Sequence, residues 1–183
     1  VRRVGGELDA ERVDALRALD ETSKATDAAI GLLAHRPRSV QEIRRRLLLK
    51  GFGAATIDGA LDRLERWRYV DDEAFARFWV ENREANKPRG RRLIEQELRT
   101  KGLDREIIAQ AISEAEIDEH AAALGLARGR LHSYSGMDQA MARRRLGAWL
   151  ARRGYGYDVV KPVLAAVFTG ADDDAEDGDE EPG

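Results

Sequence analysis

A six-residue phrase that occurs three times constrains the fold of this chain more than any other feature. In each copy a leucine is followed by two variable residues, a cation, a glycine and a large apolar residue. The copies read LLLKGF at residues 47–52, LRTKGL at 98–103 and LARRGY at 150–155, and their glycines lie 51 and 52 residues apart. The chain therefore contains an internal repeat.

Apolar residues at fixed distances from each glycine extend the repeat beyond this phrase. They stand eight and four residues before the glycine, and six, ten and thirteen residues after it. Spacings of four and three are typical of a buried helix face, and the glycine marks the end of one helix and the start of the next. A glycine can take the left-handed conformation that caps a helix, and a cation before it suits the negative end of the helix dipole. In order along the chain, these apolar residues are Ile43, Leu47, Ile57, Leu61, Leu64, Ile94, Leu98, Ile108, Ile112, Ala115, Leu146, Leu150, Val160, Leu164 and Val167.

A third helix is predicted before each of these pairs, which gives an all-α protein of nine helices in three tandem three-helix repeats. The repeats are predicted at residues 24–69, 70–117 and 118–169, and they are expected to stack as an elongated, solenoid-like array. Residues 1–23 are predicted to form a helical extension, with a separate helix from about Glu7 to Leu19. The first repeat then opens with a helix from about Lys24 to His35.

Charge divides the chain into two unlike parts. Residues 170–183 contain eight of the 34 acidic residues and none of the 31 basic ones, so this tail carries −8 and residues 1–169 carry +5. Such a composition predicts a disordered acidic tail beside a basic folded body. The tail either keeps the protein soluble or folds back over the basic surface and competes with a partner.

The sequence offers little to catalysis. It has no cysteine, and its three histidines form no HExxH pair. It also contains neither the P-loop nor the dinucleotide-binding glycine pattern. The adjacent Asp71 and Asp72 are interpreted as a helix-capping aspartate and a second acid in the first helical turn, instead of a metal or acid–base pair. Without these motifs, the chain is expected to have no enzymatic activity. It has no apolar run of membrane-spanning length and no signal-peptide core at the N-terminus, so it is expected to be a cytoplasmic protein.

Basic residues recur with the repeat and indicate a binding surface. A cation precedes each glycine, and an arginine pair stands ten and eleven residues before the second and third glycines, whereas the first repeat has its cluster at residues 44–46. If equivalent helices align, these cations form a stripe that could bind phosphates or acidic protein groups. Alternatively, they form a solvated face with partners one helical turn away, such as Glu95 for Arg99. The predicted contact residues are Arg44, Arg45, Lys50, Arg91, Arg92, Lys101, Arg143, Arg144 and Arg153.

Several stretches of the chain resemble the RecX family, the regulators of the bacterial RecA recombinase. They are residues 38–43 and 47–52, residues 67–76 with Arg83, residues 87–90 with Leu98 and 101–103, and residues 152–155. The most specific stretch is YVDDEAFA at residues 69–76. There the family typically has glycine before the tyrosine, and this chain has Arg68, which is expected to end a helix without a left-handed residue. The resemblance covers residues 24–168 and leaves out the first residues and the tail.

The resemblance implies a curved helical array that lies in the groove of the RecA filament on single-stranded DNA. It also implies a protein without cofactor that lowers ATP hydrolysis, strand exchange and co-protease activity, and that contacts single-stranded DNA directly or through RecA. We expect a monomer that does not associate with membranes. One alternative is a sequence-specific DNA-binding regulator, because three helices around a turn also describe helix-turn-helix units. Another is a scaffold that binds helical proteins without nucleic acid.

Overall fold

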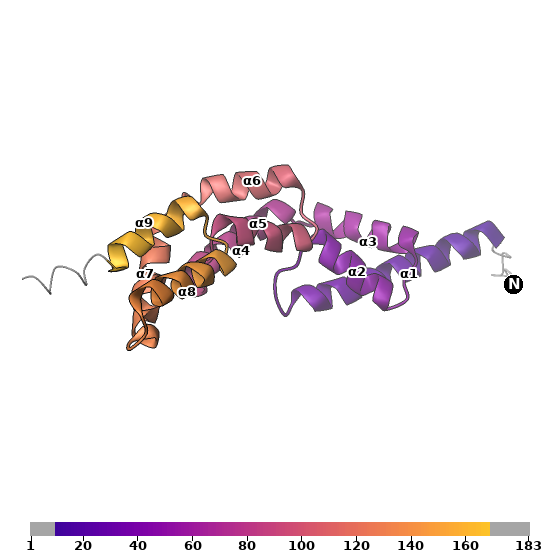
Figure 1. Ribbon diagram of the computed structural model, residues 1–183. Coiled ribbons are helices and arrows are strands. Elements are labelled where there is room, and N and C mark those ends of the chain that lie inside the picture. The colour runs from indigo at the N-terminus through magenta and orange to yellow at the C-terminus, as the bar shows by residue number, and fades with distance from the viewer. Residues whose placement is uncertain (1–9, 169–183) are drawn as a thin grey trace, which may run out of the picture. The chain divides into compact units, whose positions relative to one another are not determined.

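The structure is a computed structural model that describes residues 10–168. Within this range it contains nine α-helices, one short 3₁₀ helix and no strand (Figure 1), which confirms the predicted all-helical fold of three-helix repeats. The predicted acidic tail at 170–183 lies outside the described residues. The helices are α1 (Ala10–Leu33), α2 (Val40–Leu49), α3 (Ala54–Arg66), α4 (Asp72–Asn86), α5 (Arg91–Thr100), α6 (Arg105–Glu114), α7 (Glu119–Leu131), η1 (His132–Tyr134), α8 (Gln139–Arg152) and α9 (Tyr157–Phe168).

The described residues form two compact units. The N-terminal unit contains residues 10–75 together with the turn at 101–104, and the C-terminal unit contains residues 76–100 and 105–168. The turn of the second repeat therefore belongs to the N-terminal unit, although the two helices that it joins belong to the other.

The core of the N-terminal unit lies where α1, α2 and α3 meet. Helix α1 runs alongside α3 (Figure 1), and the apolar residues predicted from the glycine offsets fill the space between the helices. Ile43, Leu47, Ile57 and Leu64 have no exposed surface, and Leu61 is 3% exposed. Burying side chains of this size contributes about 1.5–3 kcal/mol each to folding.

Helix α1 corrects the prediction of two separate helices before residue 36. It is one continuous helix of 24 residues, so residues 10–23 extend the first helix of the repeat. Polar residues at the expected break adapt to the helix, since the Thr22 hydroxyl donates to the Ala18 carbonyl at 2.8 Å and Lys24 pairs with Asp20 at 2.6 Å. The first half of α1 projects beyond α2 and α3 (Figure 1), and Leu19 is accordingly 55% exposed.

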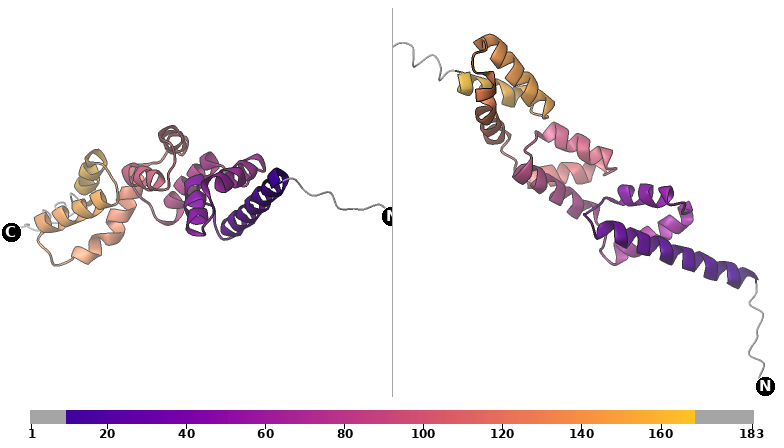
Figure 2. Two further views of the ribbon diagram at one scale, coloured as in Figure 1. Left: turned by 90° about the vertical axis from the view of Figure 1, so that its right-hand side faces the viewer. Right: turned by 90° about the horizontal axis from the view of Figure 1, so that it is seen from below.

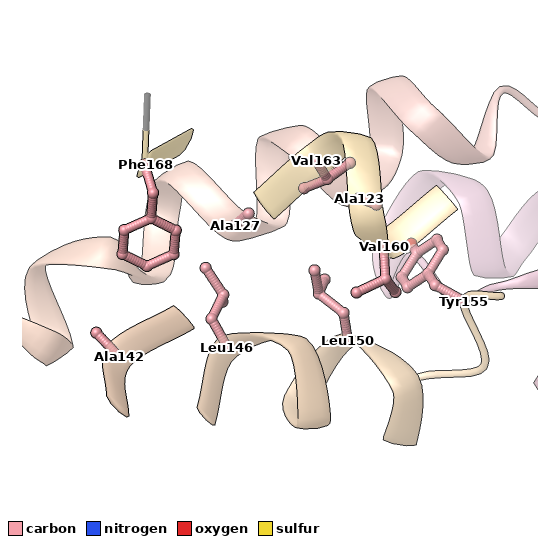
Figure 3. Close-up of a cluster of buried hydrophobic side chains, with 9 residues drawn as sticks. All are labelled: Ala123, Ala127, Ala142, Leu146, Leu150, Tyr155, Val160, Val163 and Phe168. Atoms are coloured by element: carbon pink, nitrogen blue, oxygen red, sulfur yellow. The ribbon is translucent and has the colours of Figure 1, made fainter. Parts of the chain in front are cut away.

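The core of the third repeat lies between α7, α8 and α9, which pack against one another in both views of Figure 2. Figure 3 shows its side chains: Leu146 and Leu150 of α8 face Val160 and Val163 of α9, and Phe168 closes one end. Leu146 and Leu150 are fully buried. The offset pattern thus predicts Leu146, Leu150 and Val160 correctly, whereas Leu164 and Val167 are only partly buried, and Val163 and Phe168 complete the core.

Each repeat glycine ends the middle helix of its repeat in the left-handed conformation, as predicted. The φ angles of Gly51, Gly102 and Gly154 are +90°, +83° and +91°. In the first repeat the Gly51 amide donates to the Leu48 carbonyl at 2.9 Å and the Phe52 amide to the Leu47 carbonyl at 3.2 Å. This pair of hydrogen bonds caps the otherwise unpaired carbonyls of the last helical turn.

Arg68 contradicts the expectation that the chain leaves α3 without a left-handed residue. Its φ is +57°, and only one other non-glycine residue in the described range, Glu116, also has a positive φ. The Tyr69 amide donates to the Leu64 carbonyl at 2.9 Å, so the helix ends in the same kind of cap that glycine gives elsewhere. Arginine pays a steric cost here because its Cβ crowds the backbone.

Arg68→Gly is therefore expected to raise the free energy of unfolding by about 0.5–1 kcal/mol, the left-handed strain minus the extra entropy of glycine in the unfolded chain. Urea denaturation followed by circular dichroism measures the change. Arg66→Gly, two residues earlier in the last turn of α3, is the control and should lower stability. A loss of stability in both variants would contradict the strain at Arg68.

Candidate partner interface

The middle helices α2, α5 and α8 carry most of the predicted contact residues (Figure 1). Helix α2 begins at a capping-box sequence, with Ser39 at the cap and Glu42 three residues on, and the Ser39 hydroxyl accepts the Glu42 amide at 3.2 Å. In a capping box the glutamate side chain also accepts the backbone amide of the serine. Here the Glu42 carboxylate binds Arg36 and Lys101 instead.

A carboxylate from the following repeat caps the first amide of α2 and of α5. Asp72 Oδ1 accepts the Val40 amide at 2.9 Å, and Glu119 Oε1 accepts the Arg91 amide at 2.8 Å. Val40 and Arg91 are equivalent, since each stands eleven residues before its repeat glycine. Asp71 caps its own helix α4 by accepting the Ala74 amide at 2.9 Å, which confirms the capping interpretation for that residue. No cluster that could hold a metal ion occurs within residues 10–168.

The glycine turn of the following repeat makes a second contact with the same two helix starts. The Ser39 hydroxyl donates to the Lys101 carbonyl at 2.6 Å, and the Gly90 amide donates to the Arg153 carbonyl at 2.9 Å. Ser39 and Gly90 are again equivalent, twelve residues before their glycines. The cation before a repeat glycine therefore has its backbone fixed by the preceding repeat.

Four of the nine predicted cations make contacts within the protein. Arg44 pairs with Asp58 at 2.6 Å, and the Arg91 side chain donates to the Ile117 carbonyl at 3.0 Å. Lys101, whose side chain is mostly buried, pairs with Glu42 at 3.0 Å. The Arg153 guanidinium lies 4.3 Å from the centre of the Trp149 ring, a cation–π contact. These four side chains are therefore already engaged within the protein.

The other five predicted cations are exposed and have no acidic partner among residues 10–168. They occur on all three middle helices or at their ends. Three of them, Arg92, Arg143 and Arg144, line one groove in the C-terminal unit. Exposed guanidinium and ammonium groups without partners remain available to an anionic ligand. The five are Arg45, Lys50, Arg92, Arg143 and Arg144.

Two clusters contain arginines that the predicted set of contact residues leaves out. In the N-terminal unit, Arg36, Arg38 and Arg46 join Arg45 around a cleft of about 360 Å³. In the C-terminal unit, Arg152 lines the groove of Arg92, Arg143 and Arg144. Arg152 stands inside the repeated phrase, so its position was visible in the sequence. Arg36 and Arg38 precede α2 in a loop, where no periodic pattern places a side chain.

The pKa of Glu42 reflects its contacts. Partial burial by itself would raise this pKa, but hydrogen bonds from Arg36 and Lys101 outweigh that effect and lower the pKa to about 2. A carboxylate whose pKa is depressed on folding stabilises the protein above the unfolded pKa, and this stabilisation is lost as the pH falls through the folded pKa.

Glu42→Gln is expected to lower the stability of the N-terminal unit at pH 7 by on the order of 1–2 kcal/mol, since both cations lose their anion. The difference from wild type should shrink between about pH 4.5 and pH 2, where the wild-type carboxylate takes up its proton. Urea unfolding at several pH values measures it. A difference that stays constant down to pH 2 would contradict the ion-pair explanation.

These features define a class: a helical repeat protein whose repeats interlock through helix caps and whose middle helices present exposed arginines. None of the helices among residues 10–168 combines the length and apolar character that membrane crossing requires. Family models place the chain more narrowly, as those described as the first, second and third three-helix domains of RecX match residues 25–64, 71–112 and 117–164. The chain belongs to the RecX family.

Relatives agree with this assignment, and solved structures share the fold. The chain is 39% identical over 146 residues to the regulatory protein RecX of Amycolatopsis mediterranei, covering 77% of this chain and 83% of that protein. It is 35% identical over 167 residues to the regulatory protein RecX of Mycolicibacterium smegmatis, covering 86% and 87%. A crystal structure of RecX from Lactobacillus salivarius shares the fold with a TM-score of 0.73 at 20% identity, covering 81% of this chain and 97% of that one. Another crystal structure, of a regulatory protein RecX, has a TM-score of 0.78 at 22% identity, covering 87% of this chain and 79% of that one.

Proposed function

We propose that this chain is a negative regulator of the RecA recombinase that binds the RecA filament on single-stranded DNA. The supporting observation is that all three RecX three-helix domains match in order along the chain, and that its relatives are named regulatory proteins. Binding in the filament groove would limit ATP hydrolysis, strand exchange and co-protease activity. The protein would act in the cytoplasm as a monomer, without cofactor and without chemistry of its own.

Exposed cations supply a physical basis for such binding. Arg45 and Lys50 belong to the first repeat, Arg92 to the second, and Arg143 and Arg144 to the third, and each lacks an acidic partner among the described residues. A filament on DNA offers phosphates and carboxylates over a long path, so contacts distributed over several repeats suit it. Each exposed contact is worth about 1 kcal/mol or less, and affinity would come from their number.

The proposal is tested by titrating this protein into single-stranded-DNA-dependent ATP hydrolysis by the cognate RecA. Inhibition at amounts well below one per RecA monomer is expected, because such ratios indicate action on filament growth or ends. Inhibition that begins only when the protein saturates the DNA would instead indicate competition for phosphates. Footprinting on duplex DNA then tests the alternative of a helix-turn-helix regulator, since such a regulator protects a defined site.

A charge reversal in the first repeat tests the role of the exposed cations. Arg45→Glu together with Lys50→Glu is expected to raise the concentration for half-maximal inhibition about fivefold, because two favourable contacts become repulsive. Both side chains are exposed, so helicity by circular dichroism should not change. The control is Arg12→Glu with Arg17→Glu, the same charge change on the projecting half of α1. Equal effects of the two variants would remove these cations from the interface.

A further inference from the structure

The C-terminal unit contains an open groove between α5, α8 and the start of α9. Its volume is about 790 Å³, which is in the range of ligand-binding clefts in proteins. Aliphatic side chains of Leu93, Ala148, Ala151, Val160 and Leu164 line it. We call it the α8 groove.

Comparison of the repeats explains why the groove is open. Seven residues before the repeat glycine stand Arg44 in the first repeat and Glu95 in the second, and both are engaged in ion pairs: Arg44 with Asp58 at 2.6 Å, and Glu95 with Arg99 at 2.8 Å. In the second repeat the equivalent hollow has only about 180 Å³.

The third repeat has no large side chain at these places. Gly147 takes the position of Glu95, and Ala151 takes the position of Arg99. The Glu95 and Arg99 side chains that border the smaller hollow of the second repeat thus have no large counterpart here, and both small residues line the α8 groove. The groove of the third repeat is therefore much larger than the hollow at the same place in the second repeat, although both repeats have the three-helix fold.

Charge around the groove indicates an anionic ligand. Arg92, Arg143, Arg144 and Arg152 all line it, and no carboxylate among residues 10–168 does. None of these four guanidinium groups has an acidic partner in the described part of the chain. Guanidinium groups bind carboxylates in a two-pronged geometry, so acidic side chains suit this surface well.

The apolar lining distinguishes among anionic ligands. Single-stranded nucleic acid is typically bound by several aromatic platforms on which bases stack. Here the lining is aliphatic apart from Tyr155, which is buried, and Tyr157, which is 75% exposed. A branched or unbranched aliphatic side chain, or a phenylalanine, fits such a lining, as in peptide-binding grooves that hold an apolar anchor.

The acidic tail of this chain lacks such an anchor. Residues 169–183 contain no leucine, isoleucine, valine, methionine or aromatic residue. We infer that the α8 groove is a docking site for a short acidic segment of the partner protein that carries a large apolar side chain. This inference rests on the proposed function, because the partner is the recombinase filament.

A closure variant tests the groove. Gly147→Glu with Ala151→Arg introduces the ion pair of the second repeat without a change in net charge, and Leu164, whose Cδ1 would lie 3.0 Å from the new Cβ, has to move slightly. The concentration for half-maximal inhibition of RecA ATPase should rise about tenfold, since the apolar anchor loses its place. An unchanged concentration would overturn the inference.

Arg144→Glu provides a second variant that leaves α8 intact, with Arg145→Glu as its matched control. Both residues are exposed on the same helix, but only Arg144 lines the groove. Arg144→Glu should weaken inhibition at least threefold more than Arg145→Glu, in proportion to one lost charged contact in a peptide-binding site. Equal effects would contradict docking in the groove.

Photocrosslinking identifies the occupant. With p-benzoylphenylalanine in place of Ala148, the protein bound to RecA filaments should crosslink to an acidic RecA segment with a large apolar residue, found by mass spectrometry. Adducts with DNA or with residues 169–183, or no adduct while wild type still inhibits, would overturn the inference and leave the proposed function standing. If wild type neither binds nor inhibits the filament, both fall.

Discussion

Gly154→Ala is expected to lower the free energy of unfolding of the C-terminal unit by about 3 kcal/mol, combining left-handed strain with a backbone collision. A Cβ at this position would lie 2.4 Å from the Leu93 Cβ and 2.6 Å from the Leu93 amide nitrogen. Both atoms belong to Leu93 of α5, and neither can move unless the backbone of that helix shifts. The Gly90–Arg153 hydrogen bond, which joins the second and third repeats, lies at the same place.

Gly51→Ala is the matched control. Gly51 has a φ of +90° against +91° at Gly154, but a Cβ there would meet no atom within 4 Å. Gly51→Ala should therefore lower the free energy of unfolding only by the cost of the left-handed conformation, about 1 kcal/mol. Urea denaturation gives the total loss, and hydrogen-exchange mass spectrometry assigns it to one unit. Equal losses in the two variants would show that the close approach at Gly154 adds nothing.

The success of the sequence analysis at these turns has a physical reason. A left-handed cap restricts one position to glycine, and a buried helix face requires apolar residues three and four positions apart. Both constraints are local, so they can be read along the chain three times. The same reasoning failed at Arg68. A residue other than glycine can form a left-handed cap where the strain is tolerable, and its residue type then does not indicate the cap.

Long-range contacts explain what the sequence could not predict about the cations. Lys101 and Glu42 are 59 residues apart, and Arg91 and Glu119 are 28 apart, so no helical spacing relates them. Phe78 shows the same limit: its helical spacing from Phe75 predicts a place on the buried face of α4, but it is 42% exposed, whereas Phe75 and Val80 are buried. Which apolar residues of a helix are buried depends on the helices that pack against it.

The α8 groove was not predicted from the sequence, because the groove arises where the third repeat has small residues in place of larger ones. Gly147 and Ala151 are compatible with a helix and have no functional group, so neither residue by itself indicates a binding site. Their significance comes from the Glu95–Arg99 pair at the same places in the preceding repeat. A comparison of repeats at the positions between the buried ones would have revealed the difference.

Glu97→Ala is expected to lower the stability of the C-terminal unit by about 3 kcal/mol, because it leaves two partly buried guanidinium groups without an anion. The Glu97 carboxylate accepts the Trp79 indole N–H at 2.8 Å and the Arg83 Nε–H at 2.7 Å, and it also binds Arg89. Its side chain is 15% exposed, so water replaces these contacts poorly. The Arg83 guanidinium further lies 4.4 Å from the centre of the Trp79 ring.

Glu95→Ala, two residues earlier on α5, provides the control. Glu95 also pairs with an arginine, at 2.8 Å, but the Arg99 side chain is 62% exposed. An exposed pair of this kind contributes about 0.3–0.5 kcal/mol. Urea denaturation of both variants, together with the NMR signal of the Trp79 indole N–H, measures the difference. If both variants lose the same stability, Arg83 and Arg89 are well solvated and become available to a partner. A large loss at Glu97 alone instead assigns these two arginines to the fold, and the exposed cations of the middle helices remain as the partner surface.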